Sequence, residues 1–439
     1  MSEASALLDL RVDAEDWFFS DLRIDIPPAS FGSDAINPHT QYSNPIALMG
    51  DIGVGASFTL GAGNEMVCAA AALIVSQLDG TTVGELVEAG FHKVVTNPRQ
   101  LRWLSPNAGV PLMAAGLIVN TLLDHAAKSQ GLAAWEYLAR LPTEVLLSLV
   151  DLSSFADDTI PDRARDVLDA GLEGIDGRCR NLRESGLPVY FTTWIGHSPE
   201  AIADQIVQQV DERGISRFKL KVGNDMEGDL SRLQQVRDLA PTHIELCVDA
   251  NQTLSMSQAK NWLSLLSDQG FTWLEEPFAP DNVAAFEALC DYRRTRELTA
   301  EVVTGENCPN THTAQALIEA GINRLQSDPC RMFGLVDTVT TSVLAYLSGC
   351  EVTPHAGGSG LDELSPHIQL FNLARVTGSA ASDSLTENVG FSSRFFAAPT
   401  VVSEGEARVQ TEPGFIVGLE ESVVGRLVDY REGVTWLEL

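Results

Sequence analysis

Basic residues are scarce in this chain of 439 residues, which carries 29 lysines and arginines against 60 aspartates and glutamates, for a net charge of −31. Nucleic acids and anionic lipid surfaces attract proteins through a basic face. A chain with so little positive charge is therefore expected neither to bind nucleic acid nor to dock on a membrane. An anionic substrate would also be repelled unless its binding site were locally positive.

Paired cysteines and long apolar runs are missing as well. The seven cysteines are odd in number and form no Cys-x-x-Cys pair, which argues against a disulfide framework and a zinc site. The longest apolar run, residues 66–75, is too short to cross a bilayer, and residues 1–15 carry acids instead of the basic start of a signal peptide. We therefore expect a cytoplasmic protein.

What the chain has instead is a series of polar residues, each at the end of a short apolar run. They follow one another at intervals of 22 to 31 residues, the length of a strand, a crossover helix and two loops. Because the carboxyl ends of parallel strands meet at one face of a β/α barrel, all are expected to converge there, where such barrels keep their chemistry. The series is Lys219 with Lys221, Asp249 with Asn251, Glu275, Glu306, Asp328 and His355.

This alternation predicts an α/β fold, a TIM-type barrel preceded by an α+β capping domain. Apolar runs over 45–60 indicate a hairpin, and the periodicity over 64–78 and 108–130 is typical of helices. The barrel helices are expected over 226–239, 255–269, 282–296, 310–320, 333–348 and 362–373. We expect four parts: a capping domain over 1–141, a connector over 142–184, the barrel over 185–395 and a segment over 396–439 that returns to the capping domain. Within the connector, residues 151–163 are expected to form a loop and residues 164–175 a helix.

Lys219 and Lys221 stand two residues apart in one predicted strand, and the chain has only five lysines. Alternate strand residues share a face, so both would point into the barrel unless the strand were a solvated edge. Burial and mutual repulsion lower the pKa of an ammonium group. A lysine whose pKa is lowered in this way can serve as a base.

Asp249, Glu275 and Glu306 end three successive predicted strands. Each alone could equally be a helix N-cap or a loop acid, but three carboxylates at one barrel mouth repel each other unless a cation lies between them. Oxygen ligands without histidine or cysteine indicate Mg²⁺, or Mn²⁺, rather than zinc.

His355 precedes Ala356 and a pair of glycines, which allow a ligand to approach closely. Asp328, one strand earlier, is placed to accept the other ring N–H of His355 and fix its tautomer. There are structural alternatives, since a lone histidine is more often structural than catalytic and Asp328 before Pro329 could be a helix cap. The other polar residues at strand ends favour the interpretation of His355 and Asp328 as a catalytic pair. Trp194, after the first barrel strand, would contact substrate or pack within its own loop.

Several of these segments resemble the enolase superfamily and its mandelate racemase subgroup, whose members remove a proton next to a carboxylate and use magnesium. The segments are Phe-Lys-Leu-Lys-Val-Gly (218–223), Val-Asp-Ala-Asn-Gln (248–252), Trp-Leu-Glu-Glu-Pro (273–277) and the His–Asp pair. Residues 32–35, 101–104, 328–331 and 354–364 are also similar to the L-fuconate dehydratases. The resemblance implies a (β/α)7β barrel and a small acid sugar as substrate, and we expect a homo-oligomer.

The resemblance also implies a role for each residue. Lys221 would take the C2 proton of the acid sugar, Lys219 would steady its carboxylate, and His355 would protonate the departing 3-hydroxyl. Magnesium would be held by Asp249, Glu275 and Glu306. The expected substrate-binding residues are Gly32, Ser33, Asp34, Tyr42, Trp194, Asn251 and Glu387.

Two departures concern the substrate. Fuconate dehydratases commonly carry histidine where this chain has Asn307, and tryptophan where it has Leu254. The reaction class survives these changes, while the identity of the sugar acid stays open. A racemase, epimerase or cycloisomerase would use the same metal and base; a non-catalytic binding protein is a further alternative, against which the intact polar strand ends argue.

Overall fold

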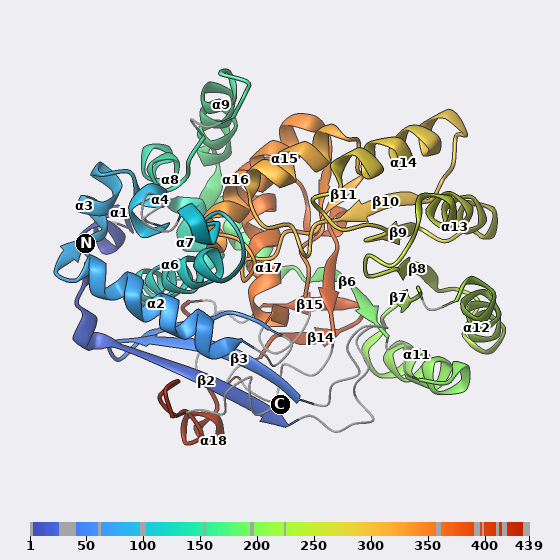
Figure 1. Ribbon diagram of the computed structural model, residues 1–439, viewed down its shortest axis with the longest axis horizontal. Coiled ribbons are helices and arrows are strands. Elements are labelled where there is room, and N and C mark those ends of the chain that lie inside the picture. The colour runs from blue at the N-terminus through green and yellow to red at the C-terminus, as the bar shows by residue number, and fades with distance from the viewer. Residues whose placement is uncertain are drawn as a thin grey trace.

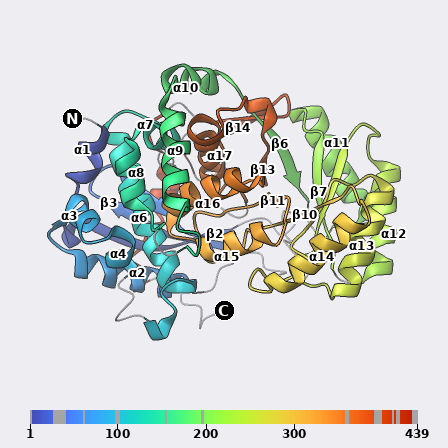
Figure 2. The same ribbon diagram turned by 90° about the horizontal axis from the view of Figure 1, so that it is seen from above.

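The computed structural model describes residues 3–25, 41–59, 63–96, 102–152, 155–193, 197–223, 225–356, 361–389, 396, 399–409, 412–414 and 419–432. An N-terminal α+β unit and a β/α barrel lie side by side in both views (Figures 1 and 2).

The barrel consists of parallel strands that alternate with helices. β6 pairs with β7, each following strand pairs with the next up to β12, and β13 pairs with the other edge of β6. The described strands are β6 (Leu187–Thr192), β7 (Arg217–Lys221), β8 (Glu245–Asp249), β9 (Trp273–Glu275), β10 (Glu301–Thr304), β11 (Arg324–Leu325), β12 (Glu351–Val352) and β13 (Thr386–Asn388). Seven helices join these eight strands, so the predicted (β/α)7β fold is confirmed.

The barrel helices begin and end where local signals favour it. Ser198, Asp225 and Asn310 cap their helices by accepting a backbone N–H three residues on. Gly214 and Gly270 end helices in the left-handed conformation that glycine adopts without strain. The helices are α11 (Pro199–Arg213), α12 (Met226–Leu239), α13 (Met256–Gln269), α14 (Val283–Thr295), α15 (Thr311–Glu319), α16 (Gly334–Ser348) and α17 (Leu361–Phe371). The bounds of the six barrel helices predicted from the sequence, α12 to α17, agree to within two residues, whereas α11 was not predicted.

Strand alternation sorts the side chains inside the barrel into layers. At the amino ends of the strands, ion pairs join Arg217 to Glu245 and Arg324 to both Glu301 and Glu351. Above them lies a separate buried cluster made of Tyr190, Cys247, Trp273, Val303 and Leu385. The polar residues predicted from the sequence form the layer at the carboxyl ends, so they rest on an aromatic and aliphatic floor.

The capping unit is an antiparallel sheet covered by helices. Its strands are β2 (Trp17–Asp25), β3 (Gln41–Met49) and β4 (Gly53–Ala56), and its main helices are α2 (Asn64–Leu78) and α6 (Gly109–Ser129). The predicted hairpin and both helices are therefore present, although β4 is shorter than expected. Within the described part of the chain, α6 alone is long and apolar enough to span a bilayer, but 83% of its apolar window is buried inside the protein.

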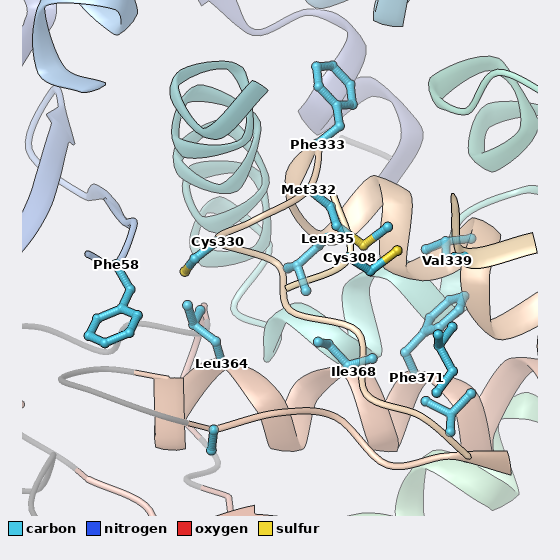
Figure 3. Close-up of a cluster of buried hydrophobic side chains, with 14 of the residues drawn as sticks. Phe58, Cys308, Cys330, Met332, Phe333, Leu335, Val339, Leu364, Ile368 and Phe371 are labelled. Carbon is cyan, nitrogen blue, oxygen red and sulfur yellow. The ribbon is translucent and has the colours of Figure 1, made fainter. Parts of the chain in front are cut away.

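An apolar cluster joins the capping unit to the barrel beside the loop that follows Asp328. Figure 3 shows Phe58 of the capping unit facing Cys330 and Leu364, with Leu335, Ile368 and Phe371 further along the barrel helices. Ser57 Oγ donates to the Cys330 carbonyl (3.3 Å), and Asn120 of α6 donates to the Pro329 carbonyl (3.2 Å). The capping unit thus holds the loop that carries one predicted catalytic residue.

The connector is more helical than expected. It contains α8 (Thr143–Leu149), α9 (Ile160–Leu172) and α10 (Ile175–Glu184). The predicted loop over 151–163 ends early because Pro161, whose fixed φ suits a first helical turn, starts α9 there. In the C-terminal segment, β14 (Val401–Ser403) and β15 (Glu406–Arg408) form a hairpin on β6, and the Tyr430 N–H donates to the Phe19 carbonyl of β2 (3.1 Å).

Arg375 ties the connector to the barrel. It lies in the π-helical turn Asn372–Thr377 after α17, is fully buried, and its guanidinium donates to the carbonyls of Leu168, Ala139 and Leu141 and to Thr143 Oγ1. We expect Arg375→Lys to leave at least two buried acceptors unpaired and to lower the free energy of unfolding by about 3 kcal/mol. Urea unfolding followed by circular dichroism measures the change.

The matched control is Arg163→Lys on α9, since that side chain is nearly half exposed. It should leave the unfolding midpoint unchanged. Equal midpoints for the Arg375 and Arg163 variants would contradict the importance of these buried hydrogen bonds.

Candidate active site

The register of three neighbouring strands brings basic and acidic side chains together. Lys221 on β7 is paired with Asp249 on β8, and Asp249 is paired with Glu275 on β9. All three point into the barrel at its carboxyl face: Asp249 and Glu275 stand two residues beyond the interior side chains of Cys247 and Trp273, and Lys221 contacts Asp249. The structure thus brings together residues that lie far apart in the sequence.

Glu306 completes the acidic group from the turn after β10. Gly305 before it has φ +140°, and a side chain there would place its Cβ 2.6 Å from the backbone nitrogen of Gln326, so only glycine fits this turn. One carboxylate oxygen from each of Asp249, Glu275 and Glu306 can lie within 4.8 Å of the others.

The donor set fits a hard divalent cation. All three carboxylates are buried, and Glu306 Oε2 makes no hydrogen bond within the described structure. Buried anionic oxygens so close together need positive charge, and oxygen ligands alone suit Mg²⁺. These are the residues that would hold magnesium, as the sequence predicted.

In the protein alone, the two lysines compensate this negative charge. Lys221 Nζ lies 2.5 Å from Asp249 Oδ2. Lys219 Nζ contacts Glu275 and lies 2.7 Å from Glu387 Oε1 and 3.6 Å from Asp249 Oδ2.

The expectation of lowered lysine pKa values is wrong for this arrangement. Burial does lower the pKa of both ammonium groups, but the surrounding carboxylates outweigh it, and the pKa of each lysine is raised. A divalent cation on the same carboxylates would oppose this effect, because it competes with the ammonium groups for the negative charge.

The carboxylates respond to the same balance. Burial raises the pKa of Glu275 to about 8, although Lys219 opposes the shift, whereas the two lysines outweigh burial at Asp249 and lower its pKa to about 2. Asp249 is therefore ready to bind a cation at any ordinary pH, while Glu275 gains from a cation that neutralises its surroundings.

His355 and Asp328 form a buried pair across the barrel from Lys221. Asp328 Oδ2 lies 3.0 Å from His355 Nδ1, and its other oxygen accepts the Cys330 N–H (2.7 Å). The Nε2 atom of His355 faces Glu306 Oε2 at 3.4 Å. Burial lowers the pKa of His355, but Glu306, the Asp328 hydrogen bond and Glu387 together raise it to about 9. In the protein alone, these contacts favour the protonated form of His355, which can act as an acid; a divalent cation on Glu306 would oppose this effect, as it does at the lysines.

One buried acid beside the site was given no role in the sequence analysis. Glu276 is fully buried, has φ +41°, and accepts hydrogen bonds from the side-chain amides of Gln252 (3.3 Å) and Asn307 (3.1 Å). Asn307 also donates to Glu306 Oε1 (3.1 Å). The residue that departs from the fuconate dehydratases therefore orients one carboxylate of the acidic group. The sequence did hold a signal for Glu276. It is an acid directly after Glu275, and an amide residue follows each neighbouring strand, Gln252 after β8 and Asn307 after β10.

Among the predicted substrate residues, Asn251 and Glu387 lie at the site. The Asn251 N–H donates to Asp249 Oδ1 (2.9 Å), and its buried side-chain oxygen makes no hydrogen bond among the described residues. Glu387 on β13 accepts from the Ala356 N–H (2.9 Å) and from Thr192 besides contacting Lys219, so protein donors engage both of its oxygens. Only the backbone of Tyr42, in β3, is described, and Gly32, Ser33, Asp34 and Trp194 lie outside the described residues.

Asp328→Asn tests the role of the pair. The amide keeps the shape of the side chain but removes the negative charge, so the pKa of His355 should fall and the catalytic tautomer should be lost. An acid works only while protonated, so activity is lost as pH rises through its pKa. We expect kcat to fall roughly 100-fold or more, and its alkaline loss to begin at lower pH. The kcat–pH profile measures both changes.

Asp337→Asn is the control, because Asp337 on α16 is also buried but lies outside the site. Its pH profile should match that of the unaltered protein. An unshifted alkaline limb in the Asp328 variant would exclude the proposed pairing with His355.

Comparisons with known proteins agree with this geometry. Residues 201–423 match the family described as enolase C-terminal domain-like. Mitochondrial enolase superfamily member 1 of Bos taurus is 30% identical over 95% of this chain and 96% of its own length. L-galactonate dehydratase of Hypocrea jecorina is 30% identical over 92% of each chain. The chain belongs to the enolase superfamily.

Solved structures extend the likeness to the whole fold. The crystal structure of human mitochondrial enolase superfamily member 1 has a TM-score of 0.85 and 28% identity, and the match covers 94% of this chain and 95% of that one. L-talarate dehydratase from Polaromonas sp. JS666, solved with Mg and L-glucarate, has a TM-score of 0.70 and 20% identity over 94% and 97% of the chains. At that identity, the second match supports the fold alone.

Proposed function

We propose that this protein is a magnesium-dependent dehydratase of six-carbon acid sugars, with L-fuconate as its first substrate. One observation carries the proposal: Lys221 on β7 and His355 after β12 stand on opposite sides of the barrel, with the acidic group on the strands between them. A base and an acid on opposite sides of one bound substrate are what elimination of water requires.

Each residue has a task that its contacts support. Lys221 removes the C2 proton of the acid sugar as a neutral amine, a form that a divalent cation on Asp249 would favour. Lys219, held between Glu275 and Glu387, balances charge that develops on the substrate carboxylate. His355, oriented by Asp328, gives its Nε2 proton to the departing 3-hydroxyl. Magnesium, when bound, supplies positive charge for the carboxylate oxygens as the C2 proton leaves. The electron pair of the C2–H bond moves first into the substrate carboxylate; it then forms the C2–C3 double bond as the C3–O bond breaks, and the 3-hydroxyl leaves as water with the proton from His355.

The choice of sugar rests on the relatives and on stereochemistry. L-fuconate is 6-deoxy-L-galactonate, so it shares the configuration at C2 to C5 with the substrate named for the Hypocrea jecorina relative. The segments that resemble the fuconate dehydratases point to the same configuration. We therefore propose acids of L-galacto configuration as the substrate class, with L-fuconate ahead of L-galactonate.

A substrate screen tests the proposal. The protein is incubated with magnesium and a set of acid sugars that includes L-fuconate, L-galactonate and diastereomers of each, and 2-keto-3-deoxy products are measured. We expect kcat/KM to be largest for the two L-galacto acids. A clear preference for a diastereomer would overturn the substrate, and formation of epimers alone would favour the racemase or epimerase alternative.

The other expectations stay predictions. The seven cysteines are all free and six are buried, which is compatible with the expected cytoplasmic location. The homo-oligomer is likewise part of the proposal, and light scattering of the purified protein tests it.

A further inference from the structure

Trp273 makes a polar contact with a metal-ligand carboxylate. It starts β9 two residues before Glu275, so both side chains point into the barrel. The indole Nε1–H donates to Glu275 Oε2 at 3.1 Å, while Lys219 contacts Glu275 Oε1. Trp273 is 3% exposed and Glu275 is fully buried. Two donors from different directions therefore define how this carboxylate is turned.

The indole ring is itself held in place. Tyr190 packs edge-on against it, with the ring centroids 5.2 Å apart and the planes at 88°. The guanidinium of Arg324 lies 5.9 Å from the ring centre and is fixed by its ion pairs with Glu301 and Glu351. On the side away from the acidic group, the ring borders a cavity of 580 Å³ at the amino ends of the strands. The Trp273 N–H thus has a defined direction that does not depend on the metal.

We propose that Trp273 is a positioning residue for the metal site: its N–H orients Glu275 so that the acidic group can bind a divalent cation. Mg²⁺ demands nearly ideal octahedral geometry, so it tolerates poorly a ligand that can rotate. Hydrogen bonds to metal ligands typically change metal affinity by 10- to 100-fold. This inference rests on the metal site of the proposed function. It gives a role to Trp273, which the sequence had placed only within the segment 273–277 that resembles the enolase superfamily.

The test is the magnesium affinity of the full-length protein in the absence of sugar, measured by titration calorimetry. Trp273→Phe keeps an aromatic ring against Tyr190 but removes the donor, and its dissociation constant should rise about 10-fold or more. Trp273→His is smaller, yet its Nε2–H can take the place of the indole N–H, so it should bind magnesium more tightly than the Phe variant. The free energy of unfolding should follow the opposite order, with the Phe variant more stable than the His variant, because histidine fills less of the apolar space left by tryptophan.

The two orders separate positioning from packing. If affinity follows side-chain size, with Phe ahead of His, or if Trp273→Phe binds magnesium as tightly as the unaltered protein, the proposal fails. If Trp273→Phe does not fold, Trp273→Leu takes its place, because leucine also lacks the donor. The magnesium affinity of Trp273→Leu is then compared with that of Trp273→His. At saturating magnesium, the KM for the acid sugar should be unchanged in the His variant.

Tyr190→Phe is the control. Its hydroxyl contacts Gln326 Nε2 at 3.3 Å and no metal-ligand carboxylate among the described residues, so magnesium affinity should not change. If the unaltered protein itself binds no magnesium, the metal site of the proposed function fails. If it binds magnesium and Trp273→Phe binds equally well, only the present inference fails.

Discussion

We expect the Lys221→Ala variant to lose both dehydration and exchange of the C2 hydrogen with deuterated water, by on the order of 1,000-fold or more. His355→Asn should stop dehydration and keep some exchange. The reason for the asymmetry is that a base on one side can remove the C2 proton without the acid on the other, because Lys219 and the metal site balance the charge. Proton NMR of L-fuconate in deuterated water follows both reactions.

Lys260→Ala is the matched control, since Lys260 lies on α13 and packs near the ring of Tyr292, outside the site. It should retain both reactions. If His355→Asn loses exchange while Lys221→Ala keeps it, the two residues have exchanged roles. The substrate would then present its C2 hydrogen to the other side, and L-fuconate would no longer be the first choice.

The second large effect concerns the metal. Dialysis against EDTA should reduce turnover below detection, and Mg²⁺ should restore it, because without a cation on Asp249, Glu275 and Glu306 the two lysines stay engaged by these carboxylates and the charge that develops on the substrate loses its main balance. Glu275→Gln should weaken Mg²⁺ binding by more than ~10-fold, since a neutral amide attracts a divalent cation far less than a carboxylate. Calorimetric titration of the dialysed protein measures the affinity.

Glu245→Gln provides the comparison within the same barrel. Glu245 is a carboxylate on β8, but it lies at the amino end and pairs with Arg217. Its variant should bind Mg²⁺ like the unaltered protein. Full activity after EDTA treatment would remove the metal assignment altogether.

The sequence predicted the barrel and its acidic group because both follow from spacing. Parallel strands of similar length must end at one face, so Asp249, Glu275 and Glu306 had to converge once the strands were identified. The bounds of α12 to α17 were equally accessible, because capping residues such as Asp225 and Asn310 mark them locally.

Spacing could not give the electrostatics of the site. The pKa values of Lys219 and Lys221 depend on which carboxylates lie beside them. Glu387, for example, lies far from Lys219 in the sequence and reaches it only because β13 pairs with β6. The bracing of Glu306 by Asn307 and the contact of Trp273 with Glu275 likewise depend on strand register and on side-chain orientation. Neither is encoded in a local pattern.

The most direct test of the central claim is a proton NMR time course of L-fuconate with the protein and Mg²⁺ in deuterated water. If Lys221 removes the C2 proton and His355 assists loss of the 3-hydroxyl, the product is the 2-keto-3-deoxy acid with one deuterium at C3, since the enol left by elimination takes its new hydrogen from solvent. Accumulation of a C2 epimer instead, or no reaction with any L-galacto acid, would contradict the account.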